Sequence, residues 1–78
     1  MEITIKLAKG FEEYIPENQE NGFCLNFDDA VPIRTVLKQL SIPGETPKLI
    51  LVNGQIRNQE QFLAHGDTLS LFPKMAGG

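Results

Sequence analysis

The side chains that most often carry chemistry are scarce in this sequence, which contains one cysteine, Cys24, and one histidine, His65. A Cys-His nucleophile needs both side chains within hydrogen-bond reach of each other, and nothing in their spacing places them together. One cysteine and one histidine cannot fill a structural zinc site, and no glycine-rich phosphate loop precedes a helix. We therefore expect a buried or bystander thiol, a loop histidine, and no metal or cofactor held by this chain.

The pair Gly77-Gly78, at the end of the sequence, is the strongest candidate for chemistry. A main-chain carboxylate is a poor acyl donor until it is activated, for example as an acyl-adenylate. Because glycine lacks a Cβ, a diglycine end can pass a narrow channel and adopt φ values closed to other residues. We expect Gly78 to react and Gly77 to give it access to a partner's nucleotide site. The alternative is an ordinary frayed terminus.

Length and charge restrict the class of protein. A chain of 78 residues is one domain, too small to enclose both a core and a deep active site, which favours a carrier or binding module over an enzyme. The net charge of -3 argues against nucleic-acid binding. The acidic residues form either a solvated face or a surface steered toward a basic partner. They concentrate at Glu12, Glu13, Glu17, Glu20, Asp28 and Asp29.

Cellular location follows from what the sequence lacks. With Cys24 alone, no internal disulfide forms. No apolar run approaches the roughly 20 residues of a membrane-spanning helix, and the first residues lack the basic and apolar regions of a signal peptide. We expect a cytoplasmic protein without membrane contact.

Apolar periodicity predicts five strands and one helix, in the order β-β-α-β-β-β. Strands are expected over residues 2–7, 23–27, 48–52, 55–57 and 68–72, and the helix over 31–40. Asn53-Gly54 predicts a type I′ hairpin turn. The remaining residues are expected as connections over 8–22 and 58–67 and as an extended tail over 73–78.

One helix and one sheet would bury their apolar faces on each other as two layers, with the first and last strands as parallel neighbours at the sheet centre. We expect Asp28 or Asp29 to stabilise the N-terminal end of the helix, where the helix dipole favours negative charge. We expect Phe62 and Leu63 to anchor their loop in the core. The expected core is Ile3, Ile5, Leu7, Phe23, Leu25, Phe27, Ile33, Val36, Leu37, Leu40, Leu69 and Leu71.

The segment 65–78, HGDTLSLFPKMAGG, combines a Gly-Asp pair, an apolar strand, Phe-Pro and a final Ala-Gly-Gly. With segments 40–43 and 51–54, it resembles the MoaD/ThiS family of β-grasp sulfur carriers, and the small subunit of molybdopterin synthase most closely. The resemblance covers nearly the whole chain. The positions that fit the pattern are Asp67, Phe72, Pro73, Ala76, Gly77 and Gly78.

This resemblance implies an α+β fold of the β-grasp (ubiquitin-like) kind, a mixed sheet of four to five strands with one main helix packed across it. It divides the chain into a β-grasp domain, residues 1–72, and a flexible tail, residues 73–78. The tail and the strand before it would bind partners through Phe72, Pro73, Lys74, Met75 and Ala76. For Phe72, simple core packing is an equal alternative.

The family's chemistry implies two partners. A MoeB/ThiF-like adenylating enzyme would activate Gly78 with ATP and magnesium, after which sulfur replaces an oxygen and leaves a thiocarboxylate. A MoaE-like large subunit, which carries the catalytic residues, would accept that sulfur during molybdopterin biosynthesis. Three alternatives stay open: a ThiS-type carrier serving thiazole synthase, a protein modifier conjugated through Gly78, and an inert interaction domain. The free chain is expected to be a monomer.

Overall fold

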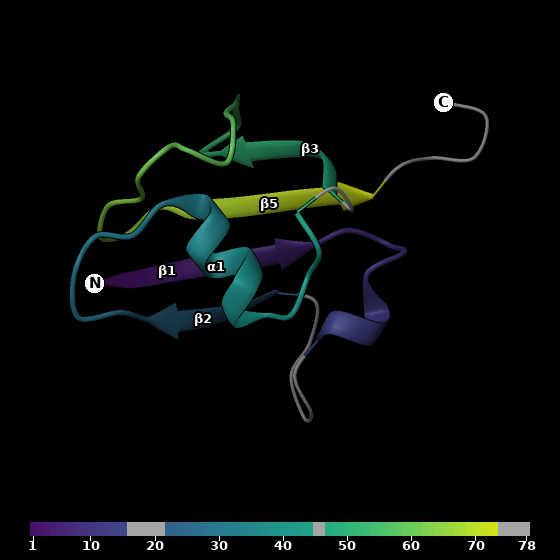
Figure 1. Cartoon of the computed structure of the whole chain (residues 1–78), viewed down its shortest axis with the longest axis horizontal. Coiled ribbons are helices and arrows are strands. Elements are labelled where there is room, and N and C mark those ends of the chain that lie inside the picture. The colour runs from purple at the N-terminus through teal and green to yellow at the C-terminus, as the bar shows by residue number, and fades with distance from the viewer. Residues whose placement is uncertain (16–21, 45–46, 74–78) are drawn as a thin grey trace.

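The computed structural model describes residues 1–15, 22–44 and 47–73, which form one mixed sheet with an α-helix on one face (Figure 1). The elements are β1 (Glu2–Leu7), η1 (Glu12–Tyr14), β2 (Gly22–Asn26), α1 (Ile33–Gln39), β3 (Pro47–Val52), β4 (Gln55–Ile56) and β5 (Thr68–Pro73). The predicted α+β class and the β-β-α-β-β-β order are confirmed. The strand ends differ from prediction by one residue at most, and β5 extends to Pro73.

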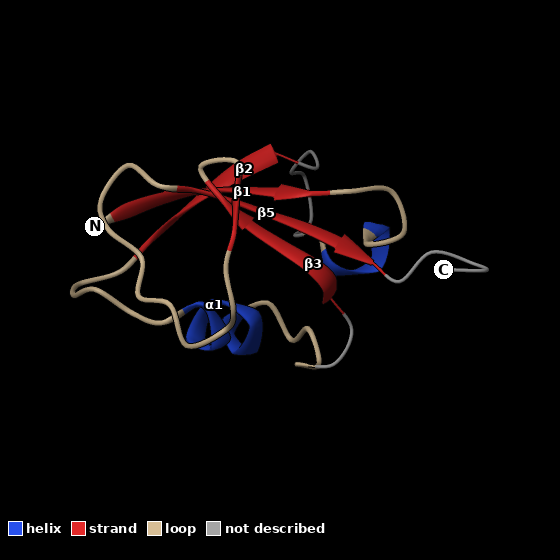
Figure 2. Cartoon of the chain, turned by 90° about the horizontal axis from the view of Figure 1, so that it is seen from above, coloured by secondary structure: helices blue, strands red, loops and turns tan. Residues whose placement is uncertain are grey.

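The strands lie in the order β2-β1-β5-β3-β4. β1 and β5 are parallel, whereas β2 on β1, β3 on β5 and β4 on β3 are antiparallel. The predicted parallel central pair is therefore confirmed. Figure 2 shows that α1 lies beneath one face of this twisted sheet. The described residues place no helix on the opposite face, which is called the open face below.

The core lies between α1 and the sheet. Most of the predicted core residues are buried, but Leu25, Phe27 and Leu40 are only partly buried at its margin. The expected core did not include Phe11, Ile42, Ile50 and Val52, which are also buried. The fully buried side chains are Phe11, Ile3, Ile5, Ile33, Leu37, Leu63, Leu69, Leu71 and Val36.

The α1 helix is shorter than the predicted 31–40 and begins after Pro32. The expectation that Asp28 or Asp29 supports its N-terminus is wrong, since the first turn holds no acidic residue and no side chain caps it. Main-chain carbonyl groups of the loop after β4 do this instead. The Ile33 N–H donates to the Gln61 carbonyl at 2.9 Å and the Arg34 N–H to the Gln59 carbonyl at 3.0 Å, which satisfies donors that a helix start leaves unpaired.

The C-terminal end of α1 is a Schellman motif. The Ile42 N–H donates to the Leu37 carbonyl at 2.8 Å and the Ser41 N–H to the Lys38 carbonyl at 3.0 Å, with Ser41 at a φ of 61°. Ile42, which is buried, brings this exit into the core. The helix thus ends within one residue of the predicted end at residue 40.

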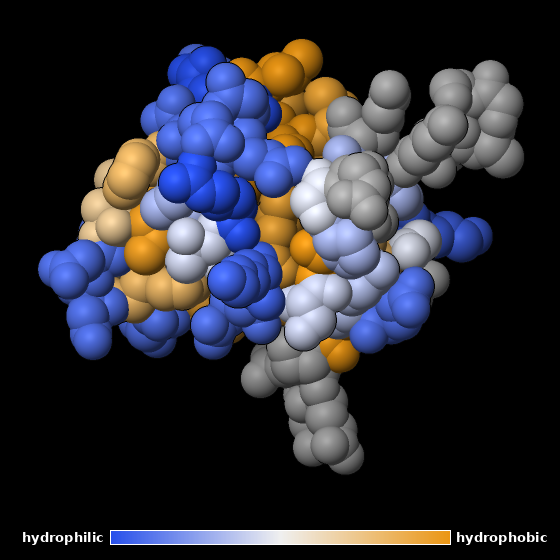
Figure 3. All heavy atoms as spheres, in the orientation of Figure 1, coloured by the Kyte–Doolittle hydropathy of each residue, from blue (hydrophilic) through white to orange (hydrophobic). Residues whose placement is uncertain are grey.

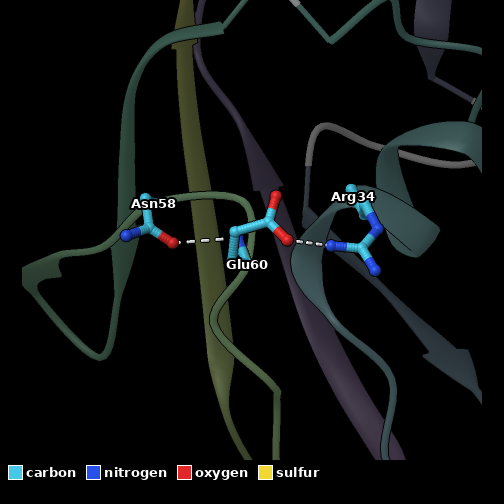
Figure 4. Close-up of polar contacts among 3 residues, drawn as sticks. All are labelled: Arg34, Asn58 and Glu60. Carbon is cyan, nitrogen blue, oxygen red and sulfur yellow. Dashed lines mark hydrogen bonds and ion pairs between the residues drawn. The ribbon is translucent and has the colours of Figure 1, made fainter.

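Polar side chains of the loop between β4 and β5 bind this loop to α1. Figure 4 shows Glu60 between Arg34, with which its carboxylate forms an ion pair, and Asn58, whose side chain accepts from the Glu60 N–H at 2.9 Å. Leu63 is buried as predicted, but Phe62 is 58% exposed, so its assignment to the core is wrong. Neighbouring residues in an extended segment point to opposite sides, and only Leu63 faces the core.

The connection after β1 is pinned to the body of the domain by an aromatic residue, as its Phe11, Tyr14 and Ile15 allow one to expect. Phe11 is completely buried, and its ring lies 5.7 Å from that of Tyr14 in η1. Figures 1 and 2 show η1 at the end of the sheet where β1 and β5 finish. One buried aromatic residue thus holds this connection beside the end of β5.

Candidate functional site

The predicted site lies at the end of β5 and continues beyond it. Phe72 and Pro73 are the last two residues of β5. The other predicted site residues, Lys74, Met75, Ala76, Gly77 and Gly78, lie outside the described residues. The part of the site that the structure describes is therefore the end of β5 and the residues around it, which are called the platform below.

The alternation of side chains along β5 determines on which face of the sheet Phe72 lies. Leu69 and Leu71 are completely buried against α1, and residues two apart in a strand share a face. Phe72, in the other phase, lies on the open face and is 36% exposed. Of the two interpretations of Phe72, the structure does not support core packing, because this side chain is not part of the buried cluster.

Phe72 is one end of an apolar stripe across the open face, formed by Phe72, Leu49, Leu51 and Ile56. Phe72 pairs with Leu49 between β5 and β3, and Leu51 pairs with Ile56 between β3 and β4. Directly opposed residues in antiparallel strands project to the same face. Leu49 and Leu51 are half-buried, while Ile56 is 69% exposed. Figure 3, viewed from the α1 side, shows apolar atoms above β3 at the top of the molecule.

Beside Phe72, on the β1 side, the open face is hollowed. Lys6 lies between Gly22 of β2 and Ser70 of β5 in the sheet register. Gly22 contributes no side chain, and a Cβ there would meet nothing within 4 Å. A partner that bound in this hollow would meet an apolar wall and one cation, Lys6. The hollow is lined by Lys6, Leu7, Ala8, Gly22, Ser70 and Phe72.

The β3–β5 ladder ends at a pair of prolines. Pro73 is opposed by Pro47, and an irregularity in register separates this pair from the pair Leu49 and Phe72. Proline has no N–H to donate, so neither residue extends the ladder as a donor. The last residue of β5 is therefore held by packing more than by ladder hydrogen bonds.

Other residues singled out in the sequence lie away from this platform. Asp67 precedes β5 at its opposite end and accepts hydrogen bonds from the Ala64 N–H at 2.8 Å and the Asn53 side chain at 2.9 Å. Cys24 Sγ lies 3.8 Å from Thr4 Oγ1, and His65 Nδ1 accepts from the Glu2 N–H at 3.0 Å. Asp67 thus has a structural role, and Cys24 and His65 each have a partner of their own.

From the sequence, Phe72 was expected to form a docking patch with exposed apolar neighbours, but these neighbours were not identified, and the hollow was missed. A signal for the stripe was present, because the run Leu-Ile-Leu-Val over residues 49–52 is apolar in both phases of a strand and must therefore place apolar residues on both faces. The hollow had no such signal, since it depends on the register that sets Gly22 beside Lys6.

Within residues 1–15, 22–44 and 47–73, no three His, Cys, Asp or Glu side chains come together as a metal site would require. The same residues contain no helix of the length and hydropathy needed to cross a membrane.

Comparison with known proteins identifies the family of the chain and supports its fold. The model of the ThiS family matches residues 12–78. Among solved structures, the chain resembles one from the protein-protein complex of subunits 1 and 2 of molybdopterin-converting factor from Helicobacter pylori 26695, with 22% sequence identity, a TM-score of 0.62 and complete coverage of both chains. No curated protein matches the chain.

The helix packed across a mixed sheet with a parallel central pair defines a β-grasp, ubiquitin-like domain. Around the end of β5, this domain presents the apolar stripe and the hollow. The chain belongs to the ThiS family, which confirms the resemblance drawn from the sequence.

Proposed function

We propose that this protein is a sulfur carrier whose Gly78 carboxylate is adenylated and converted to a thiocarboxylate for molybdopterin biosynthesis. The observation that carries the proposal is the match to the ThiS family, which extends through Gly77 and Gly78. The likeness to a chain of a molybdopterin-converting factor complex supports the choice of pathway. In this function the protein is a carrier, and the catalytic residues lie on its partners.

The chemistry requires two displacement steps. A carboxylate oxygen of Gly78 attacks the α-phosphorus of ATP, and pyrophosphate leaves. Sulfide from the sulfur donor then attacks the acyl carbon, AMP leaves with the oxygen, and a thiocarboxylate remains on Gly78. Both steps take place in a MoeB/ThiF-like enzyme, which supplies ATP and magnesium. Gly77 serves this chemistry because a residue without a Cβ enters a confined site.

The platform would serve docking. Residues 1–72 act as the β-grasp body, and residues 73–78 as the tail that reaches the partner's site through Lys74, Met75 and Ala76. Phe72 and Pro73 lie where body and tail meet. The stripe of Phe72, Leu49, Leu51 and Ile56 supplies apolar area of the kind that forms the centre of protein interfaces. A MoaE-like large subunit and the adenylating enzyme would bind this platform in turn.

The experiment uses intact-mass measurement. The purified chain is incubated with a MoeB/ThiF-like enzyme, ATP, magnesium and a sulfur donor, beside a variant that lacks Gly77-Gly78. We expect the mass gain of a sulfur-for-oxygen exchange in the full chain and no change in the truncated variant. An unchanged mass of the full chain, with an enzyme shown to be active on another carrier, would overturn the proposal.

A second candidate is a carrier for thiamine thiazole synthesis, which the name of the matching family favours. The two candidates share the chemistry at Gly78 and differ in the acceptor. The thiocarboxylated chain is therefore offered separately to a MoaE-like subunit with a cyclic pterin precursor and to a thiazole synthase. Sulfur transfer to the pterin supports the first candidate, and transfer only to the thiazole product supports the second.

A further inference from the structure

The last residue of β5 lies against a glycine of the turn that follows β1. A Cβ on Gly10 would lie 2.8 Å from Pro73 Cγ and 3.5 Å from Pro73 Cβ. The first of these separations is shorter than carbon atoms tolerate without a shift. Gly10 also has a φ of 111°, in the region that favours glycine. Two independent constraints therefore require glycine at this position, and one of them is contact with Pro73.

The turn that carries Gly10 is fixed on both sides. The Ala8 N–H donates to the Leu71 carbonyl of β5 at 3.0 Å, and the Phe11 N–H donates to the Ala8 carbonyl at 3.2 Å. Phe11 is completely buried. Since the residues before and after Gly10 are anchored to β5 and to the core, Gly10 cannot easily retreat from Pro73.

Pro73 is also supported from the opposite direction. β5 lies between β1 and β3 in the sheet, and Pro47 of β3 is the register partner of Pro73. Pro47 is buried and Pro73 is half-buried. The final residue of β5 is thus held between Gly10 on the β1 side and Pro47 on the β3 side.

We propose that Gly10 is a positioning residue for the reaction at Gly78. Because Gly10 has no side chain, Pro73 can pack directly against its Cα. This contact fixes the position of Pro73 and so sets the point at which the tail leaves the sheet. This inference rests on the proposed sulfur-carrier function. Docking through the stripe of Phe72, Leu49, Leu51 and Ile56 is separate from this contact. A shift of Pro73 should therefore impair delivery of the carboxylate to ATP more than it impairs docking.

The test is a double-mutant cycle on adenylation. Wild type, Gly10→Ala, Pro73→Ala and the double variant are assayed for pyrophosphate release with a MoeB/ThiF-like enzyme and ATP, and kcat and KM are measured separately. Gly54→Ala is the matched control, because Gly54 also has a positive φ of 83° but no atom lies within 4 Å of its Cβ position. Melting curves establish that each variant is folded.

We expect Gly10→Ala to lower kcat by about tenfold to a hundredfold, the range produced by small misplacement of a reacting group, with little change in KM. Gly54→Ala should retain the wild-type kcat. In the double variant, the two losses should not multiply, because Pro73→Ala removes the Cγ atom that the new Cβ would meet. If Gly10→Ala does not fold, Pro73→Ala alone should still lower kcat, by a larger factor than any change in KM.

A wild-type kcat in Gly10→Ala overturns the inference. So do losses that multiply in the double variant, because the effect of Gly10 would then arise from its φ alone. If Gly10→Ala is unfolded, a wild-type kcat in Pro73→Ala also overturns the inference. A wild-type chain that releases no pyrophosphate would instead overturn the proposed function on which this inference rests.

Discussion

Asn53 and Asp67 link the end of β3 to the start of β5 through their side chains. The Asn53 side-chain N–H donates to Asp67 Oδ1 at 2.9 Å, and Asn53 Oδ1 accepts from the Thr68 N–H at 2.9 Å. Asn53 occupies the hairpin turn at a φ of 53°. The same residue therefore makes the β3–β4 turn and fixes the start of β5, which sets the register that places Phe72 opposite Leu49.

Replacing Asp67 by Ala should lower the free energy of unfolding by about 1–2 kcal/mol, since the Ala64 N–H and the Asn53 side chain each lose an acceptor worth roughly 0.5–1.5 kcal/mol. Urea denaturation measures the change. Asp28→Ala, at an exposed position, is the control and should be nearly neutral. Equal stability of Asp67→Ala and wild type would show that the link between Asn53 and Asp67 contributes nothing.

Replacing Phe72 by Asp should weaken binding to the adenylating enzyme by at least about tenfold, as expected when an apolar contact at an interface centre is lost. Phe72 is 36% exposed on the open face, so its covered part also contributes to stability, and melting curves establish that the variant is folded. Phe62→Asp is the matched control, because Phe62 is exposed but belongs to the loop after β4. Isothermal titration calorimetry distinguishes the variants, and equal affinities for both would contradict the docking role of the stripe.

Replacing Phe11 by Ala should remove about 3–5 kcal/mol of stability, the usual loss for a buried phenylalanine. Phe11 is completely buried between β1 and η1. Small domains have total stabilities of roughly 5–15 kcal/mol, so this variant should approach unfolding at room temperature. The measurement is the denaturant midpoint, with Phe62→Ala as the control. A midpoint close to wild type would mean that η1 refolds around another anchor.

Replacing Glu60 by Gln should change the free energy of unfolding by less than about 1 kcal/mol, as is usual for exposed ion pairs. The side chains of Arg34 and Glu60 in Figure 4 are 56% and 72% exposed. The main-chain bonds from Ile33 and Arg34 to the loop remain in this variant. A loss well above that value, measured by urea denaturation at low and high salt, would show that the ion pair holds the loop.

The sequence by itself determined the elements and their order. Period-two alternation in β1 and β5 and the helical stripe of α1 depend on local geometry, which neighbouring residues specify. The same holds for the Asn53-Gly54 turn, where both φ angles are positive as its residue types require. The Gly77-Gly78 pair and the segment before it also indicated the family, which the family match bears out.

Only the tertiary structure decided which residues surround the end of β5. Gly10 and Pro73 are distant in sequence, and their contact exists because β1 and β5 pair in parallel and the next turn closes over Pro73. The capping of α1 by Gln59 and Gln61 has the same origin, as does the exposure of Phe62 beside the burial of Leu63. Such contacts depend on the register of the strands and on which segments of the chain meet. The periodicity of a single segment specifies neither the register nor the meeting of segments.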